Sequence, residues 1–323
     1  MVVIDLQPFI EERGLIMSEL TKEQMYEDIR RWKKEKNAVI LAHYYQIGDI
    51  QDIADYVGDS LALAQTAAKT DADIIVFCGV HFMAETAILL SQKKKVLLPV
   101  MEAGCVMANM MAEAKIKKYR EEHPDTVILM YVNSTAACKQ YADVCVTSSN
   151  AMKIIDHYAK MGKPMLYGPD KNLGAYAMTK SDVKLDLWPG FCGIHNGLKP
   201  SDVDLAKAKY PNALFVAHPE CNLDVLSKAD YIGSTKQLIE YVTKSEHDEF
   251  IIGTEGGVIH AMEKKNPNKK FHLLSDRLNC FEMKLTRLED LWKVLRDEDN
   301  VIEIPEDVAK RAVKCVDKML ELS

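Results

Sequence analysis

Residues 38–45 read AVILAHYY, an apolar run that predicts a buried β-strand ending near His43. The same pattern returns as TVILMYVNS over 126–134 and as ALFVAHPE over 213–220. Three landmarks follow each copy: an Ala-Asp pair, a hydroxyl-rich helix start and a closing cysteine. The pairs are Ala54-Asp55, Ala142-Asp143 and Ala229-Asp230, and the helix starts are Gly58-Asp59-Ser60, Thr147-Ser148-Ser149 and Gly233-Ser234-Thr235. The closing cysteines are Cys105, Cys192 and Cys280. Successive cysteines are 87 and 88 residues apart, a regular interval that indicates an internal repeat.

Strands and helices alternate within each copy, which predicts parallel sheets joined by helical crossovers. We therefore expect an α/β fold of three homologous α/β/α units with parallel sheets, in a pseudo-threefold arrangement around a central active site. The expected parts are an N-terminal extension over 1–20, a first unit over 21–108 closed by a C-terminal helix over 306–323, a second unit over 109–195 and a third over 196–305.

The composition is that of a globular protein. With 48% hydrophobic and 28% charged residues in 323, the chain is neither disordered nor fibrous. No apolar run approaches the roughly 20 residues of a membrane span, and residues 1–20 lack the basic start and apolar core of a secretory signal. The net charge of -7 argues against a broad nucleic-acid surface. We expect a cytoplasmic protein that binds neither membrane nor nucleic acid.

Eight cysteines occur without any CxxC pair, so metal ligation or catalysis is a better explanation than a disulfide framework. Cys105, Cys192 and Cys280 hold equivalent repeat positions and should converge at the symmetry axis. Thiolates are soft ligands that select iron–sulfur clusters or zinc. Three ligands on a cubane leave one iron open as a Lewis acid. The alternative is that all three are ordinary buried cysteines. We expect no ligand role for the others, which are Cys78, Cys138, Cys145, Cys221 and Cys315.

Several short motifs together resemble the quinolinate synthase family from about residue 22 onward: AHYYQ (42–46), GDSL (58–61), FMAETA (82–87), MYVNSTA (130–136), TSSNA (147–151), GPDKNL (168–173), HPEC (218–221) and GST (233–235). The resemblance implies a [4Fe-4S] cluster on Cys105, Cys192 and Cys280. It implies condensation of iminoaspartate with dihydroxyacetone phosphate to quinolinate, phosphate and two waters, a step of de novo NAD biosynthesis. Family members with CxxCxxC near the last ligand differ from this chain, which has Cys280 alone.

A phosphate ester and a dicarboxylate require an anion-binding site. Ser60, Ser148 and Thr235 lie at strand-to-helix turns, one per unit, where helix N-termini offer N–H donors and a favourable dipole. The plain alternative is that each is only an N-cap. A cap hydroxyl that turns toward a ligand satisfies both readings, so we expect these three residues to bind substrate.

The condensation also needs acids and bases with suitable pKa values. We expect Tyr45 and Glu220 to move protons, with His43 beside them as a further catalytic candidate. We expect six residues to bind substrate carboxylates or hydroxyls. Five follow corresponding strands, His43, Tyr131, Asn133, His218 and Glu220, and His195 lies close to the cysteine ligand Cys192.

Two other functions stay open. One is a different iron–sulfur hydro-lyase acting on a small hydroxy acid, which would need no phosphate site. The other is a non-enzymatic cluster protein or a zinc-stabilised structural protein, with His195 as the fourth ligand. The family resemblance implies functional coupling to an aspartate oxidase or an aspartate dehydrogenase as the source of iminoaspartate.

Overall fold

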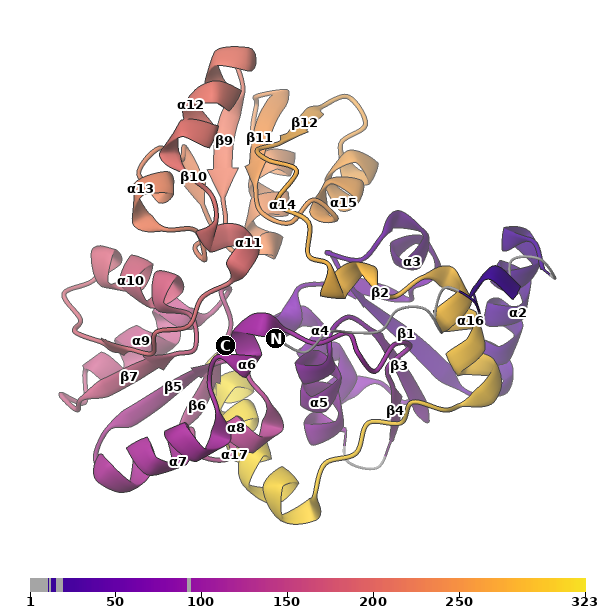
Figure 1. Ribbon diagram of the computed structural model, residues 1–323, viewed down its shortest axis with the longest axis horizontal. Helices are drawn as coiled ribbons and strands as arrows, with labels where there is room; N and C mark the ends of the chain where they lie inside the picture. The colour runs from indigo at the N-terminus through magenta and orange to yellow at the C-terminus, as the bar shows by residue number, and fades with distance from the viewer. Residues whose placement is uncertain (1–10, 12, 16–19, 92–93) are drawn as a thin grey trace.

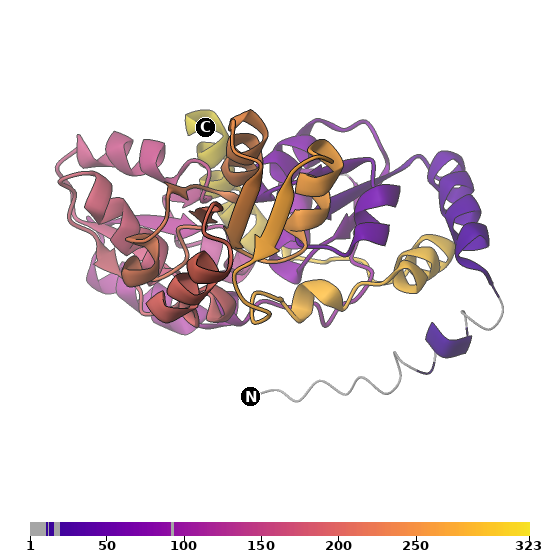
Figure 2. The same cartoon turned by 90° about the horizontal axis from the view of Figure 1, so that it is seen from above.

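Three four-stranded parallel sheets surround a common centre in the computed structural model, which describes residues 11, 13–15, 20–91 and 94–323 (Figure 1). A view turned by 90° shows the three units side by side in a molecule that is wider than it is thick (Figure 2). The expected α/β fold of three units is confirmed. Most of the expected N-terminal extension, 1–20, lies outside the described residues.

The first unit has the strand order β2-β1-β3-β4. Its strands are β1 (Ala38–His43), β2 (Tyr56–Gly58), β3 (Ile74–Cys78) and β4 (Lys95–Leu97), and its helices are α2 (Lys22–Glu35), α3 (Gly48–Ile53), α4 (Ser60–Lys69) and α5 (His81–Leu90). The short helix α6 (Val106–Asn109) follows β4 and leads toward the second unit.

The second unit repeats this order as β6-β5-β7-β8. Its elements are α7 (Glu113–Glu122), β5 (Val127–Tyr131), α8 (Ala136–Lys139), β6 (Val144–Val146), α9 (Ala151–Ala159), β7 (Met165–Gly168), α10 (Lys171–Lys180) and β8 (Asp186–Leu187), followed by α11 (Gly193–Asn196).

The third unit repeats it again as β10-β9-β11-β12. Its elements are α12 (Pro200–Lys209), β9 (Leu214–Ala217), α13 (Leu223–Leu226), β10 (Tyr231–Ile232), α14 (Thr235–Lys244), β11 (Glu249–Gly253), α15 (Val258–Lys265) and β12 (Lys270–Leu273). The 3-10 helix η1 (Glu282–Lys284), α16 (Leu288–Asp297) and α17 (Glu306–Leu322) complete the chain.

The shared strand order explains why the site lies at the centre. In each unit the chain leaves the first strand toward one edge of the sheet and then crosses back to the third strand. The carboxyl ends of these two strands form a topological switch point, where open parallel sheets bind ligands. The ends of β1, β5 and β9 all reach the centre, because His43, Tyr131 and His218 line one cavity there.

The repeated Ala-Asp pair has a structural role. The carboxylates of Asp55, Asp143 and Asp230 each accept the backbone N–H of a first-strand residue fifteen positions earlier, over 2.7–2.8 Å. Each carboxylate also pairs with a cation from the helix that precedes the first strand of its unit, as Asp55 does with Lys33 of α2 over 2.7 Å. The three aspartates therefore stabilise equivalent positions in the three units.

We expect Asp55→Ala to lower the free energy of unfolding by about 1–2 kcal/mol, because a charged hydrogen bond to a buried strand is lost while a partly exposed ion pair adds little. Chemical denaturation with Asp156→Ala, on the exposed side of α9, as the control measures this. Equal midpoints for the two variants would contradict a fastening role for Asp55.

The last two helices, α16 and α17, pack against elements that are distant from them in the sequence. α16 lies within 196–305, yet it packs on α2 and β3 of the first unit. α17 packs on α8 and β6 of the second unit as well as on α5 of the first, because its buried side chains join the apolar core shared by both units. Among the described helices, none is both long and apolar enough to cross a lipid bilayer.

Candidate functional site

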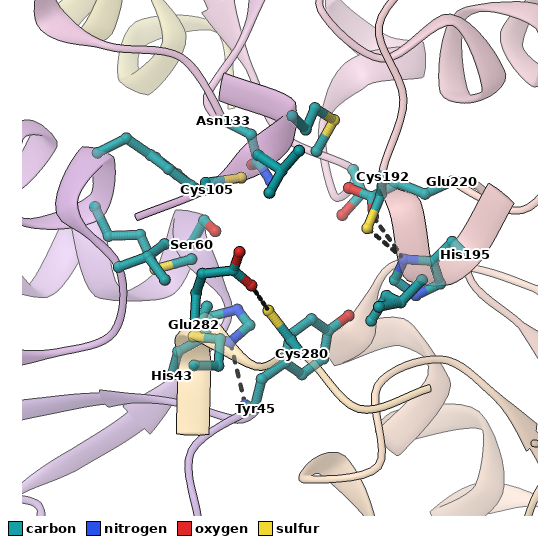
Figure 3. A pocket seen from close by; sticks show the side chains of 18 of the residues that line it. His43, Tyr45, Ser60, Cys105, Asn133, Cys192, His195, Glu220, Cys280 and Glu282 are labelled. Carbon is teal, nitrogen blue, oxygen red and sulfur yellow. Dashed lines mark hydrogen bonds and ion pairs between the residues drawn. The ribbon is translucent and has the colours of Figure 1, made fainter. Parts of the chain in front are cut away.

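One cavity of about 220 Å³ lies where the three units meet. Every site residue expected from the sequence lines it: His43, Tyr45, Ser60, Cys105, Tyr131, Asn133, Ser148, Cys192, His195, His218, Glu220, Thr235 and Cys280. Figure 3 shows cysteine, histidine and carboxylate side chains entering this cavity from different sides. None of the five other cysteines, all of them in the described chain, lines it.

The three lining cysteines occupy similar local positions. Cys105 precedes α6, Cys192 precedes α11, and Cys280 lies just before η1. Burial raises the pKa of all three thiols, to about 12 for Cys105, while the backbone N–H three residues further on favours each thiolate. Three thiols that are neutral on their own, with N–H groups facing the sulfurs, suit a soft metal centre whose positive charge replaces the protons.

A second set of donors surrounds Cys192. His195 Nδ1 lies 3.2 Å from Cys192 Sγ and 2.9 Å from Glu220 Oε2. The ligand atoms of these three residues all lie within 4.8 Å of one another, so together they could hold a metal ion. The cavity therefore contains metal-binding chemistry, contributed by cysteine, histidine and glutamate.

His43 and His218 have matching hydrogen bonds at the ends of β1 and β9. Nδ1 of each ring accepts the backbone N–H two residues further on, from Tyr45 over 3.2 Å and from Glu220 over 3.3 Å. Because a backbone N–H can only donate, a neutral ring carries its hydrogen on Nε2. Burial lowers the pKa of His43 to about 3 and that of His218 to about 4. Both rings are thus neutral near pH 7 and carry their hydrogen on Nε2, which in His218 lies 3.2 Å from Ser148 Oγ.

Glu220 is a buried carboxylate. Burial raises its pKa, but the imidazoles of His218 and His195 and the hydroxyl of Tyr131 outweigh burial and hold the pKa at about 2. Tyr131 donates its hydroxyl hydrogen to Oε1 over 2.6 Å. Burial, followed by the charge of Glu220, raises the pKa of Tyr131 and of Tyr45 well above its usual value. In the cavity the ionised Glu220 therefore lies beside two neutral phenols.

Ser60, Ser148 and Thr235 are not the N-caps of their helices. Asp59 caps α4 and Ser234 caps α14, so Ser60 and Thr235 are the first helical residues. Ser148 lies two residues before Asn150, the cap of α9. Ser149 Oγ bonds both Asp59 Oδ2, over 2.6 Å, and Ser234 Oγ, over 2.8 Å. In each turn one residue, Asp59, Ser149 or Ser234, links the units. The residue next to it, Ser60, Ser148 or Thr235, lines the cavity.

Sequence reasoning missed several polar residues around the cavity. Asp170 and Glu255 follow the third strands of their units at matching positions and accept the backbone N–H of Cys192, over 3.2 Å, and of Cys280, over 3.1 Å. Lys284 pairs with Glu255 over 2.8 Å. Glu282 lines the cavity, with Oε2 3.6 Å from Cys280 Sγ. The repeat could have revealed Asp170 and Glu255, since each lies beyond the third strand of its unit.

Comparison with known proteins shows the family. The family model described as "NadA: Quinolinate synthetase A protein" matches residues 27–321. A quinolinate synthase of Alkaliphilus metalliredigens is 47% identical over 304 residues, which cover 94% of this chain and 100% of that protein. Quinolinate synthase 2 of Methanosarcina acetivorans is 42% identical over 312 residues, 97% of this chain and 99% of that protein. The chain belongs to the quinolinate synthase A family.

Proposed function

We propose that this protein condenses iminoaspartate with dihydroxyacetone phosphate to form quinolinate, inorganic phosphate and two molecules of water. The observation that carries the proposal is the convergence of three cysteines, an ionised glutamate and three helix starts on one cavity. This set matches the three demands of the reaction, which are a Lewis acid, a base and a site for anions.

We further propose that Cys105, Cys192 and Cys280 hold a [4Fe-4S] cluster. Three protein ligands on a cubane leave one iron free to polarise a substrate hydroxyl during dehydration. The soft donor set supports a cluster, and a single ion on Cys192, His195 and Glu220 is the competing arrangement. Iron and acid-labile sulfide analysis separates the two, because a cluster requires four of each per chain and a single ion requires no sulfide.

The remaining residues divide binding and proton transfer. Glu220, held ionised, is the base for the proton beside the imine, and Tyr45 is the phenol that returns a proton. The Nε2–H of neutral His43 donates to a substrate carboxylate or hydroxyl without adding charge. His218 binds substrate together with Ser148, whose hydroxyl lies 3.2 Å from His218 Nε2. Tyr131 keeps the Glu220 carboxylate in place through its 2.6 Å hydrogen bond, and Asn133 is a further donor to substrate.

Ser60, Ser148 and Thr235 are proposed to hold the phosphate or a carboxylate at the convergent helix starts. We expect Ser148→Ala to raise the KM for dihydroxyacetone phosphate about 10- to 100-fold, because a hydrogen bond to a charged group contributes roughly 1.5–3 kcal/mol. Initial rates at varied dihydroxyacetone phosphate measure this. Ser227→Ala, whose hydroxyl bonds the carbonyl of Asp224 on the surface, is the control. An unchanged KM would favour the hydro-lyase alternative, which needs no phosphate site.

Anaerobic turnover tests the main proposal. Purified protein, reconstituted with iron and sulfide, is mixed with dihydroxyacetone phosphate and with iminoaspartate generated in place from oxaloacetate and ammonia, and quinolinate is quantified by chromatography. Quinolinate and phosphate in equal amounts are the expected products. A full cluster without quinolinate would contradict the proposed reaction and favour a different iron–sulfur hydro-lyase.

The cellular setting follows from the same chemistry. Three thiols that must stay reduced to bind metal suit the cytoplasm, where thiols are kept reduced. Iminoaspartate has to be made by an enzyme that oxidises aspartate, so we propose functional coupling to an aspartate oxidase or an aspartate dehydrogenase.

A further inference from the structure

Thr254 joins two of the cavity residues from behind. It follows β11 directly, and its side chain is fully buried. Its hydroxyl lies 2.8 Å from the Tyr45 hydroxyl and 3.0 Å from His195 Nε2. Tyr45 belongs to the first unit and His195 to α11 after the second, so one hydroxyl of the third unit holds side chains from the other two.

The neighbours of Thr254 have further partners of their own. The Tyr45 hydroxyl also lies 2.9 Å from Thr235 Oγ1, and His195 Nδ1 lies 2.9 Å from Glu220 Oε2 and 3.2 Å from Cys192 Sγ. Thr254 therefore links Tyr45 to the group of side chains around Cys192.

We propose that Thr254 is a positioning residue for the condensation: its hydroxyl bridges Tyr45 and His195 and holds both side chains in place. This inference rests on the proposed function, which gives Tyr45 its role in proton transfer. Without the hydroxyl, the Tyr45 hydroxyl and His195 Nε2 lose a common partner in a buried space. Both groups then seek other partners, and Tyr45 no longer holds one arrangement toward the substrate.

The test compares Thr254→Val, which keeps the shape but removes the hydroxyl, with Thr254→Ser, which keeps the hydroxyl. We expect kcat of the valine variant to fall about 10- to 100-fold, as for other residues that orient active groups, with KM for both substrates and iron and sulfide content unchanged. The serine variant should stay within about threefold of the parent. Thr286→Val is the matched control, because Thr286 is equally buried and its hydroxyl has no hydrogen-bond partner within the described chain.

Two results would overturn the inference. If the valine and serine variants have the same kcat, the hydroxyl does not position Tyr45. If the valine variant loses iron or melts much earlier than the Thr286→Val control, Thr254 is only structural.

A readout that needs no turnover separates this inference from the proposed function. In protein with 15N-labelled histidine, the ring nitrogen signals of His195 should be alike in the parent and in Thr254→Ser, and should shift or split in Thr254→Val. That pattern in a protein that makes no quinolinate would overturn the reaction while supporting the role of Thr254. His195 signals that are the same in Thr254→Val as in the parent would overturn the role of Thr254 whether or not quinolinate forms.

Discussion

Replacing Cys105, Cys192 or Cys280 with alanine is expected to abolish both cluster binding and quinolinate formation. Each cysteine comes from the end of a different unit, so no other cysteine in the cavity can take its place. Removing a Lewis acid that contributes several kcal/mol to dehydration should lower kcat/KM by at least about 1000-fold. Iron, sulfide and quinolinate are measured on each variant after anaerobic reconstitution.

Cys78→Ala is the control for this set. Cys78 is a fully buried cysteine of β3 that does not line the cavity, so its loss should leave a small void and a normal cluster. The ligand assignment would be wrong if one of the three variants kept four irons and four sulfides per chain. The single-ion arrangement would instead be favoured if metal were lost in Cys192→Ala, His195→Gln and Glu220→Gln but kept in Cys105→Ala and Cys280→Ala.

Glu220→Gln is expected to lower kcat about 100- to 10000-fold, the usual contribution of a general base. The amide has nearly the same shape, and its oxygen can still accept from the Tyr131 hydroxyl, so the cavity should stay intact. The variant loses the negative charge of the carboxylate. In the parent protein, the two imidazoles and Tyr131 keep Glu220 ionised at neutral pH. Steady-state rates and the visible spectrum of the cluster measure activity and cofactor separately.

Glu240→Gln provides the comparison for Glu220. Glu240 is an exposed residue of α14 whose ion pair with Lys244 spans 3.9 Å, so the same chemical change there should leave kcat unaltered. A Glu220→Gln variant with full kcat but a raised KM would show that Glu220 binds substrate and that another group removes the proton.

The fold and most of the cavity could be predicted because the repeat places them in local sequence. A buried strand followed by a polar residue marks a strand end, and three such ends must meet if three units share an axis. His43, Tyr131 and His218 were found in this way, and Ser60, Ser148 and Thr235 by their place before or at a helix start. The repeated aspartates were recognised as landmarks, although their hydrogen bonds to the first strands became clear only in the structure.

The packing of the last helices depended on tertiary contacts. The sequence shows that α16 and α17 each have one apolar face, but it does not show which surface receives that face. α16 returns to the first unit and packs with α2, while α17 fills the junction between the first and second units. An amphipathic pattern fixes that a face is buried, and only the shapes of the other elements decide where.

The repeating unit and the residues at its strand ends could therefore be read from the chain alone, because they follow from local periodicity. The bonds between side chains of different units depend on how the units pack together. Thr254 is the clearest case: by sheet register its counterparts in the other two units are Gly79 and Pro169, neither of which has a side chain that can hydrogen-bond. The repeat gives no signal at such a position, and its role arises because the third unit alone brings a hydroxyl between Tyr45 and His195.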